Sequence, residues 1–339
     1  MQSVRALTKE LEQAKGQDVV KCLKASLHVA IKLEFATIPP YLTAMWSIKD
    51  GRHEVAQTIK EIVEEEMLHM GLVCNMLVAL GEAPVLTAAG AVPQYPGPLP
   101  GDVHLGLVVS LRRLVPAQLQ TFMDIEYPDG GPVSLRAADA FETIGAFYVA
   151  LLKAFEVADP PLDTQRQREL AFSAESQLFE VAKVADVRRA VDLIRRQGEG
   201  SKASPEETPG HLAHYYQFRE VYAGAKYVKN PKSGVWEHAG APVLMPEVWP
   251  MADIPTGGYL QADVPADVWT KLLDFDTKYA TMLRQLEKAW QDPAAPLGDY
   301  SENDPVLTML GLGPVARELM QIERRDRRGN YGPCFRLVK

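Results

Sequence analysis

The chain has 339 residues, of which 47% are hydrophobic and 24% are charged, and this composition is typical of a globular protein with a sizeable core. Its net charge of −8 disfavours nucleic acid and anionic membrane lipid as partners, because both bind basic surfaces. No apolar run is long enough to span a bilayer, and no signal peptide pattern opens the sequence. Three cysteines without close spacing indicate neither a disulfide framework nor a cysteine zinc site, so we expect a cytoplasmic protein with reduced thiols.

The first two predicted elements are long helices. Apolar residues recur at helical spacing over residues 18–48 and again over about 52–80, where Gly81 should end the second helix. Pro39 and Pro40 should bend the first helix, because proline lacks the backbone donor that a helix interior uses. Since a short connection makes consecutive helices antiparallel neighbours, we expect a helical hairpin.

The rest of the chain alternates between irregular and helical stretches. Residues 82–133 are rich in proline and glycine and fit a long crossover with short structured pieces at Val103–Leu111 and Pro116–Phe122. Residues 224–264 have the composition of an irregular loop. Further helices are predicted at about 135–157, 165–182, 187–197, 211–223, 265–291 and 304–325.

Strand patterns are sparse, so the sequence predicts an all-α helix bundle. Residues 1–225 should form the bundle, with the 82–133 crossover inserted in it. Residues 226–339 should form a loop-rich segment and a C-terminal helical hairpin that pack on the same domain.

A Glu-x-x-His pair lies on the second predicted helix. Glu66 and His69 leave the same side of that helix, and their neighbours on this side are apolar. Burying a carboxylate and an imidazole there is unfavourable unless they are paired or bind a metal ion. The alternative is a solvated acidic turn, since the adjacent Glu64 and Glu65 are expected to be exposed.

Glu34 is the natural partner of this pair, because it lies on the apolar stripe of the preceding helix. In carboxylate-bridged helix bundles, one helix supplies Glu-x-x-His and another supplies a single Glu. The sequence therefore predicts a metal site formed by Glu34, Glu66 and His69.

Four more residues are candidate ligands. His211 and His214 open a later helix and form a plausible donor pair, although one could cap the helix while the other packs on an aromatic ring. Glu199, between two glycines, could present a carboxylate from a sharp turn or be an exposed loop acid. Glu142 lies on an otherwise apolar helix and could be a ligand or one end of a salt bridge.

Several segments together resemble a known family, the ferritin-like proteins related to the iminophenyl-pyruvate dimer synthase domain of violacein-type pathways. The segments that carry the resemblance are Leu33–Leu42, Glu65–Met70, Thr143–Tyr148, Gln197–Gly200, His214–Phe218 and Gly332–Phe335. The resemblance implies a ferritin-like four-helix bundle, here with a long crossover insertion and additional C-terminal helices. It also implies a metal, usually iron, between the helices, with Glu34, Glu66, His69, Glu199 and His214 at ligand positions.

The sequence departs from the family pattern at two positions. Ala146 stands where the family often has Glu, and His211 stands where it often has the Glu of a Glu-x-x-His. Fewer carboxylates would change the metal preference of the site. A single-ion site, a different metal or a degenerate site all fit these departures.

The function that the resemblance implies is an oxidative enzyme of specialised metabolism. One or two iron ions, or another divalent transition metal, would activate dioxygen or peroxide against a small aromatic or amino-acid-derived substrate, for imine coupling or oxidation. Tyr41 and Tyr148 are candidate catalytic residues near the metal, although buried tyrosines are more often core residues. The alternatives are a non-catalytic metal-binding or storage protein and a helical scaffold with a degenerate metal site. Ferritin-like bundles often pair, so a homodimer is a further expectation.

Overall fold

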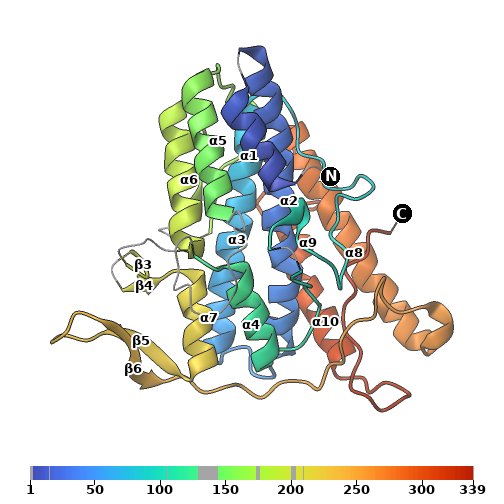
Figure 1. Cartoon of the computed structure of the whole chain (residues 1–339). Coiled ribbons are helices and arrows are strands. Elements are labelled where there is room, and N and C mark those ends of the chain that lie inside the picture. The colour runs from blue at the N-terminus through green and yellow to red at the C-terminus, as the bar shows by residue number, and fades with distance from the viewer. Residues whose placement is uncertain are drawn as a thin grey trace.

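The computed structural model describes residues 3–14, 16–104, 106–128, 144–172, 176–199, 204–208 and 210–338. These residues form a mostly helical bundle with additional helices on one side, which confirms the predicted all-α class (Figure 1). Within the described part of the chain, no helix has both the length and the apolar character needed to cross a membrane.

Two long antiparallel helices form the centre of the bundle. Helix α2 (Gln17–Ser47) and helix α3 (Glu54–Ala79) pack along each other, as the apolar periodicity predicts. Gly81 follows α3 with a positive φ of 83°, a conformation that favours glycine at a helix end. Pro39 and Pro40 lie inside α2, where Pro40 cannot donate to the carbonyl of Ala36. That carbonyl instead accepts a 2.7 Å hydrogen bond from the Tyr95 hydroxyl.

The other two corners of the bundle are each filled by two shorter helices. Helices α5 (Ile144–Ala158) and α6 (Val184–Glu199) pack against each other, and so do α4 (Pro116–Ile125) and α7 (His214–Ala223). In Figure 1, α4 lies below α5 in one corner, and α7 lies below α6 in the other corner. Both corners are therefore interrupted part of the way along α2 and α3, and the interruptions turn out to coincide with the candidate site.

Further helices surround this frame. Helix α1 (Val4–Gln13) packs on α2 and α5, while α8 (Ala266–Gln291) and α10 (Leu312–Met320) cover α3 and α2 from the opposite side. The helix predicted over 304–325 is divided at Gly311 into α9 (Pro305–Leu310) and α10. Two short 3-10 helices, η1 (Pro100–Asp102) and η2 (Gln261–Asp263), lie in connecting segments.

Three small antiparallel strand pairs complete the fold. They are β1 (Leu170–Ala171) with β2 (Gln177–Leu178), β3 (Glu206–Thr208) with β4 (His211–Leu212), and β5 (Ala225–Lys229) with β6 (Trp236–Pro242). The β5–β6 hairpin extends away from the bundle (Figure 1). The expectation of irregular loop throughout 224–264 is therefore wrong for the hairpin.

The predicted helix over 165–182 is also wrong, and buried amides give the physical reason. The amide of Asn75 on α3 bonds the backbone of Arg168 and the carbonyl of Phe179, at 2.8–3.0 Å. The Gln167 side chain bonds both backbone groups of Val181. These buried side chains satisfy an extended backbone, so tertiary hydrogen bonds override the helical pattern of this segment.

Candidate metal centre

One half of the candidate centre comes from the two long helices. Glu34 lies on α2, and Glu66 and His69 lie one turn apart on α3. All three are buried, with exposed fractions of 5%, 2% and 1%. The His69 Nδ1 atom lies 3.7 Å from Glu34 Oε2 and 3.6 Å from Glu66 Oε1. The structure thus brings these three predicted residues together in the bundle core.

The other half comes from the two interrupted corners. Glu126 directly follows α4, and the fully buried His214 is the first residue of α7. The His214 Nδ1 atom lies 3.0 Å from Glu66 Oε1 and 3.7 Å from Glu126 Oε2. Two groups, Glu34–Glu66–His69 and Glu66–Glu126–His214, therefore share Glu66, and each group has its donor atoms within 4.8 Å of one another. This is the carboxylate-sharing arrangement with which helix bundles hold two ions.

Aromatic packing fixes the helix ends that carry Glu126 and His214. The Tyr41 ring on α2 lies 4.5 Å from the Phe122 ring on α4 and 5.1 Å from the Phe218 ring on α7, and the two phenylalanine rings are 5.0 Å apart. Phe122 precedes Glu126 by four residues and Phe218 follows His214 by four, so each ring lies one turn from its candidate ligand. Helical spacing and this cluster together aim both ligands at Glu66.

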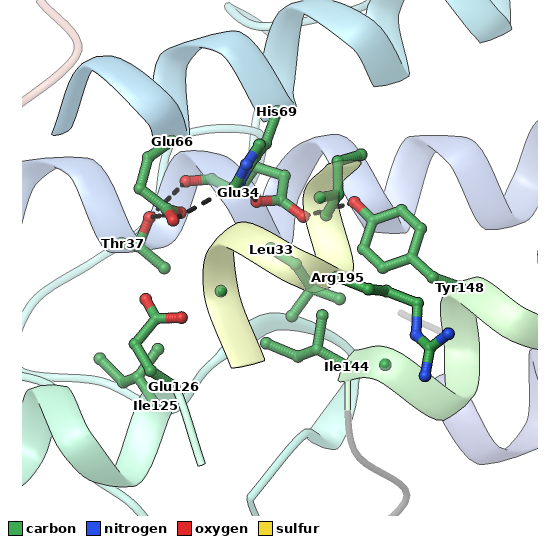
Figure 2. A pocket seen from close by; sticks show the side chains of 13 residues that line it. Leu33, Glu34, Thr37, Glu66, His69, Ile125, Glu126, Ile144, Tyr148 and Arg195 are labelled. Carbon is green, nitrogen blue, oxygen red and sulfur yellow. Dashed lines mark hydrogen bonds and ion pairs between the residues drawn. The ribbon is translucent and has the colours of Figure 1, made fainter. Parts of the chain in front are cut away.

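The three carboxylates of these two groups each accept a hydrogen bond from a different buried hydroxyl. Tyr148 on α5 donates to Glu34 Oε1, and Thr37 donates to Glu66 Oε2 at 2.6 Å (Figure 2). Tyr41 donates to Glu126 Oε1 at 2.6 Å. A hydroxyl that holds one oxygen restricts the rotation of its carboxylate and leaves the second oxygen free to face the centre.

The outward nitrogens of both histidines are held by a single network. His69 Nε2 lies 2.8 Å from Gln197 Oε1, Gln197 Nε2 donates to Glu65 Oε1 at 3.0 Å, and His214 Nε2 lies 2.8 Å from Glu65 Oε2. Because the Gln197 and Glu65 oxygens can only accept, both histidines carry a proton on Nε2. With a metal ion bound, each imidazole would lose any proton on Nδ1 and direct the lone pair of that atom into the centre, as metal ligands do.

The charges inside the centre point to bound cations. Burial, reinforced by repulsion from Glu66, raises the pKa of both Glu34 and Glu126. Burial opposes protonation of the histidines, but the neighbouring carboxylates raise the pKa of His69 to about 10 and that of His214 well above its usual value. Without a metal ion, protons must take the place of the missing positive charge.

An unsatisfied atom supports the same conclusion. His214 Nδ1 is fully buried and close to Glu66, yet it has no hydrogen bond in proper geometry among the described residues. A cavity of about 30 Å³ lies at the centre and is lined by Glu34, Glu66, His69 and Glu126 (Figure 2). A water-sized occupant needs about 10–15 Å³, so the cavity has the scale of an ion or a diatomic molecule. Three carboxylates and two imidazoles suit a first-row transition metal, so the residues present fit such a group.

The remaining predicted residues have different positions. His211 lies outside the centre, with its Nδ1 atom 2.9 Å from Glu207 Oε2, in a partly buried group that includes Glu65. Glu199 is the last residue of α6, and its side chain is outside the described part of the structure. Glu142 lies outside the described residues altogether. Tyr41 and Tyr148 both contact candidate ligands.

Sequence reasoning missed Glu126 and misjudged Glu65. Glu126 follows a ten-residue helix in a proline-rich region, and its only signal is that Leu119, Phe122 and Glu126 lie at helical spacing. Glu65 was expected to be exposed but is 7% exposed, because α6 and α7 cover this face of α3. Glu126, the residue that follows α4, gives the candidate centre a third carboxylate.

Comparison with known proteins agrees with this architecture. A family profile described as ferritin-like matches residues 27–223, more than half of the chain and the whole span that contains the candidate ligands. The crystal structure of a ferritin-like protein from Caulobacter vibrioides superposes with a TM-score of 0.65 over 92% of this chain and 96% of that one, at 23% identity, which shows a shared fold. No functionally curated protein matches the chain. The chain belongs to the ferritin-like family.

Proposed function

We propose that the chain is an iron-dependent oxidative enzyme of specialised metabolism. The observation that carries the proposal is the pair of Glu/His groups that share Glu66. Glu34, Glu66 and His69 would hold one ion, and Glu66, Glu126 and His214 would hold the second. Bound iron would supply the redox chemistry by which dioxygen or peroxide oxidises a substrate.

The chain's own residues would organise this chemistry. Burial, reinforced by the neighbouring carboxylates, raises the pKa of Tyr41 and of Tyr148 well above the usual value. Both phenols therefore keep their protons and donate hydrogen bonds to Glu126 and Glu34. Aliphatic side chains, including Leu33 and Ile125, line the small cavity and limit access of water (Figure 2). Such a site would restrain the carboxylates of Glu34 and Glu126 and hold protons on the hydroxyl oxygens of Tyr41 and Tyr148.

The substrate that we propose is a small aromatic or amino-acid-derived molecule. Support for a small aromatic or amino-acid-derived substrate, undergoing imine coupling or oxidation, comes from the family resemblance in the sequence. The cavity is too small for an aromatic ring, so we expect the organic substrate to bind beside it while dioxygen or peroxide enters it.

A cytoplasmic location is supported by three cysteines that are all free.

Metal analysis with matched variants tests the proposal. Purified protein should bind up to two iron(II) ions per chain without oxygen, and Glu66→Ala should abolish this binding because both groups need Glu66. Glu64→Ala, two residues away and paired with Lys60 on the surface, is the control and should bind iron normally. Oxygen consumption by the loaded protein, followed by turnover of aromatic amino acids or their imines, would support an enzyme.

Two results would contradict the proposal. Normal iron binding by Glu66→Ala would mean that the metal lies elsewhere. Iron uptake far beyond two ions per chain, without any substrate turnover, would favour the storage alternative.

A further inference from the structure

Five oxidisable aromatic rings form a continuous row through the lower part of the molecule. They are Tyr127, Tyr215, Tyr216, Tyr227 and Trp236, and successive ring centroids lie 5.7, 5.0, 5.5 and 5.6 Å apart. Each ring therefore contacts the next. No phenylalanine interrupts the row, whereas the neighbouring cluster around Tyr41 is completed by two phenylalanines.

The inner end of the row is connected to the candidate metal centre through the backbone. Tyr127 follows Glu126 in the chain, and Tyr215 follows His214, so both inner rings are borne by the residues next to candidate ligands. Tyr215 is 9% exposed, so its ring is largely shielded from solvent.

The outer end of the row lies on the projecting hairpin. Tyr227 on β5 and Trp236 on β6 stack at an interplanar angle of 26°, and both are partly exposed. The guanidinium of Arg219 lies 5.7 Å above the Tyr227 ring, and the exposed Lys229 and Lys232 lie on the same hairpin. In a chain of net charge −8, this end of the row is locally basic and suits an anionic reductant.

We propose that this ring row conducts single electrons from the hairpin surface to the metal centre, a role that rests on the function proposed above. Tyrosine and tryptophan are the aromatic side chains that lose an electron most readily, and contact between rings keeps each transfer short. The row would return the centre to its reduced state between turnovers, or remove oxidising equivalents when no substrate is bound.

Each transfer would move one electron from the hairpin surface to the centre and release one proton. An inner tyrosine would give one electron to the oxidised centre, and its phenolic proton would pass to water. Each outer ring in turn returns one electron and one proton to its inner neighbour. An anionic one-electron reductant such as ascorbate finally restores Trp236 by giving up one electron and one proton. All five rings end unchanged, one electron has entered the centre, and one proton has been released.

A metal-free experiment tests conduction by itself. A ruthenium photo-oxidant is tethered to Ser233→Cys at the hairpin turn, in a Cys22→Ser background because the other two cysteines are buried. After a laser flash with an irreversible electron acceptor, a radical should form at Trp236 and reach the inner tyrosines. Nitroso spin-trapping and peptide mass spectrometry would locate it at Tyr215 and Tyr127.

Removing one hydroxyl should break the row without disturbing packing. A barrier increase of about 1.4 kcal/mol slows a step ten-fold, and phenylalanine is harder to oxidise than tyrosine by much more than this. Tyr216→Phe should therefore lower the spin-trap labelling of Tyr215 and Tyr127 about ten-fold or more. Tyr222→Phe is the matched control: it lies on the same helix, is 50% exposed and has no ring contact among the described residues. Unchanged inner labelling in Tyr216→Phe would overturn the proposal.

A second arm uses the iron-loaded protein. Ascorbate should reduce the oxidised centre, followed by its visible absorption, about ten-fold or more slowly in Tyr216→Phe than in Tyr222→Phe. If iron binds and reacts with oxygen but the two variants are reduced at equal rates, conduction along the row is refuted and the proposed function stands. If no iron binds, the proposed function fails, and with it electron supply to the centre. Radical transfer in the metal-free arm would then show that the row itself conducts.

Discussion

Glu65 holds both candidate histidine ligands, so a single isosteric change at this position should weaken metal binding. Its two carboxylate oxygens accept from Gln197 Nε2 at 3.0 Å and from His214 Nε2 at 2.8 Å. In Glu65→Gln one of these acceptor oxygens becomes an NH₂ donor, so either Gln197 or His214 loses its acceptor. The orientation of at least one imidazole is then no longer fixed.

The expected magnitude follows from this loss. Replacing an outer partner of a histidine ligand typically weakens metal binding ten- to a hundred-fold. This range corresponds to about 1.4–2.7 kcal/mol of binding free energy. The protein should still fold, because glutamine has the size of glutamate and the rest of α3 is unchanged.

Anaerobic competition titration would measure the effect. Metal-free protein is titrated with cobalt(II) against a chromophoric chelator, and the cobalt absorption bands report whether the imidazoles still coordinate. Glu64→Gln is the control, since the Glu64 carboxylate pairs with Lys60 at 2.7 Å on the solvent side of the same helix. Wild-type affinity and spectra in Glu65→Gln, or an equal loss in Glu64→Gln, would refute the reasoning.

Three further outcomes concern the metal-free protein. Tyr41→Phe and Tyr148→Phe each remove a hydroxyl donor from a buried carboxylate and should lower the free energy of unfolding by about 1–3 kcal/mol, measured by chemical denaturation, whereas the exposed Tyr222→Phe should not. Burial opposes protonation of His69, but the adjacent carboxylates raise its pKa to about 10. Protonated His69 therefore stabilises the folded protein fully below the unfolded pKa of about 6.5, and this stabilisation is lost as pH rises toward 10. Melting temperatures in chelator should therefore fall over this range more than those of the metal-loaded protein, and a rise would contradict the assignment. Asn75→Leu removes the four hydrogen bonds of the buried Asn75 side chain and should cost about 4 kcal/mol of unfolding free energy, with a change below about 1 kcal/mol as the contradicting result.

The parts of the fold that local sequence determines could be predicted. The periodicity of apolar residues identifies α2, α3 and α8, because each of these helices buries a stripe along its whole length. The same periodicity places Glu34, Glu66 and His69 toward the core, where the structure brings them together. Helical phase therefore sufficed for the half of the centre that lies on uninterrupted helices.

The other half depends on tertiary contacts that leave little local signal. Glu126 and His214 lie at the ends of ten-residue helices, and only the packing of Phe122 and Phe218 against Tyr41 places them beside Glu66. Glu65 was misjudged because the exposed face of α3 was assumed to include it, whereas α6 and α7 cover Glu65 and leave only Glu64 beside it toward solvent.

The interruption of two bundle corners has a consequence for local unfolding. Helices of ten residues are too short to be stable alone, so α4 and α7 depend on their contacts with each other and with α2 and α3. A metal ion bound by Glu66, Glu126 and His214 would connect α4 and α7 to α3 across 60 residues of chain (Glu66 to Glu126) and 148 residues (Glu66 to His214), and closing loops of that length restricts many open conformations. Loss of the metal should therefore lower hydrogen-exchange protection first in α4 and α7, while α2 and the buried end of α3 keep the protection of the global fold. The ligands would then control how often this end of the molecule opens, in addition to holding the ions.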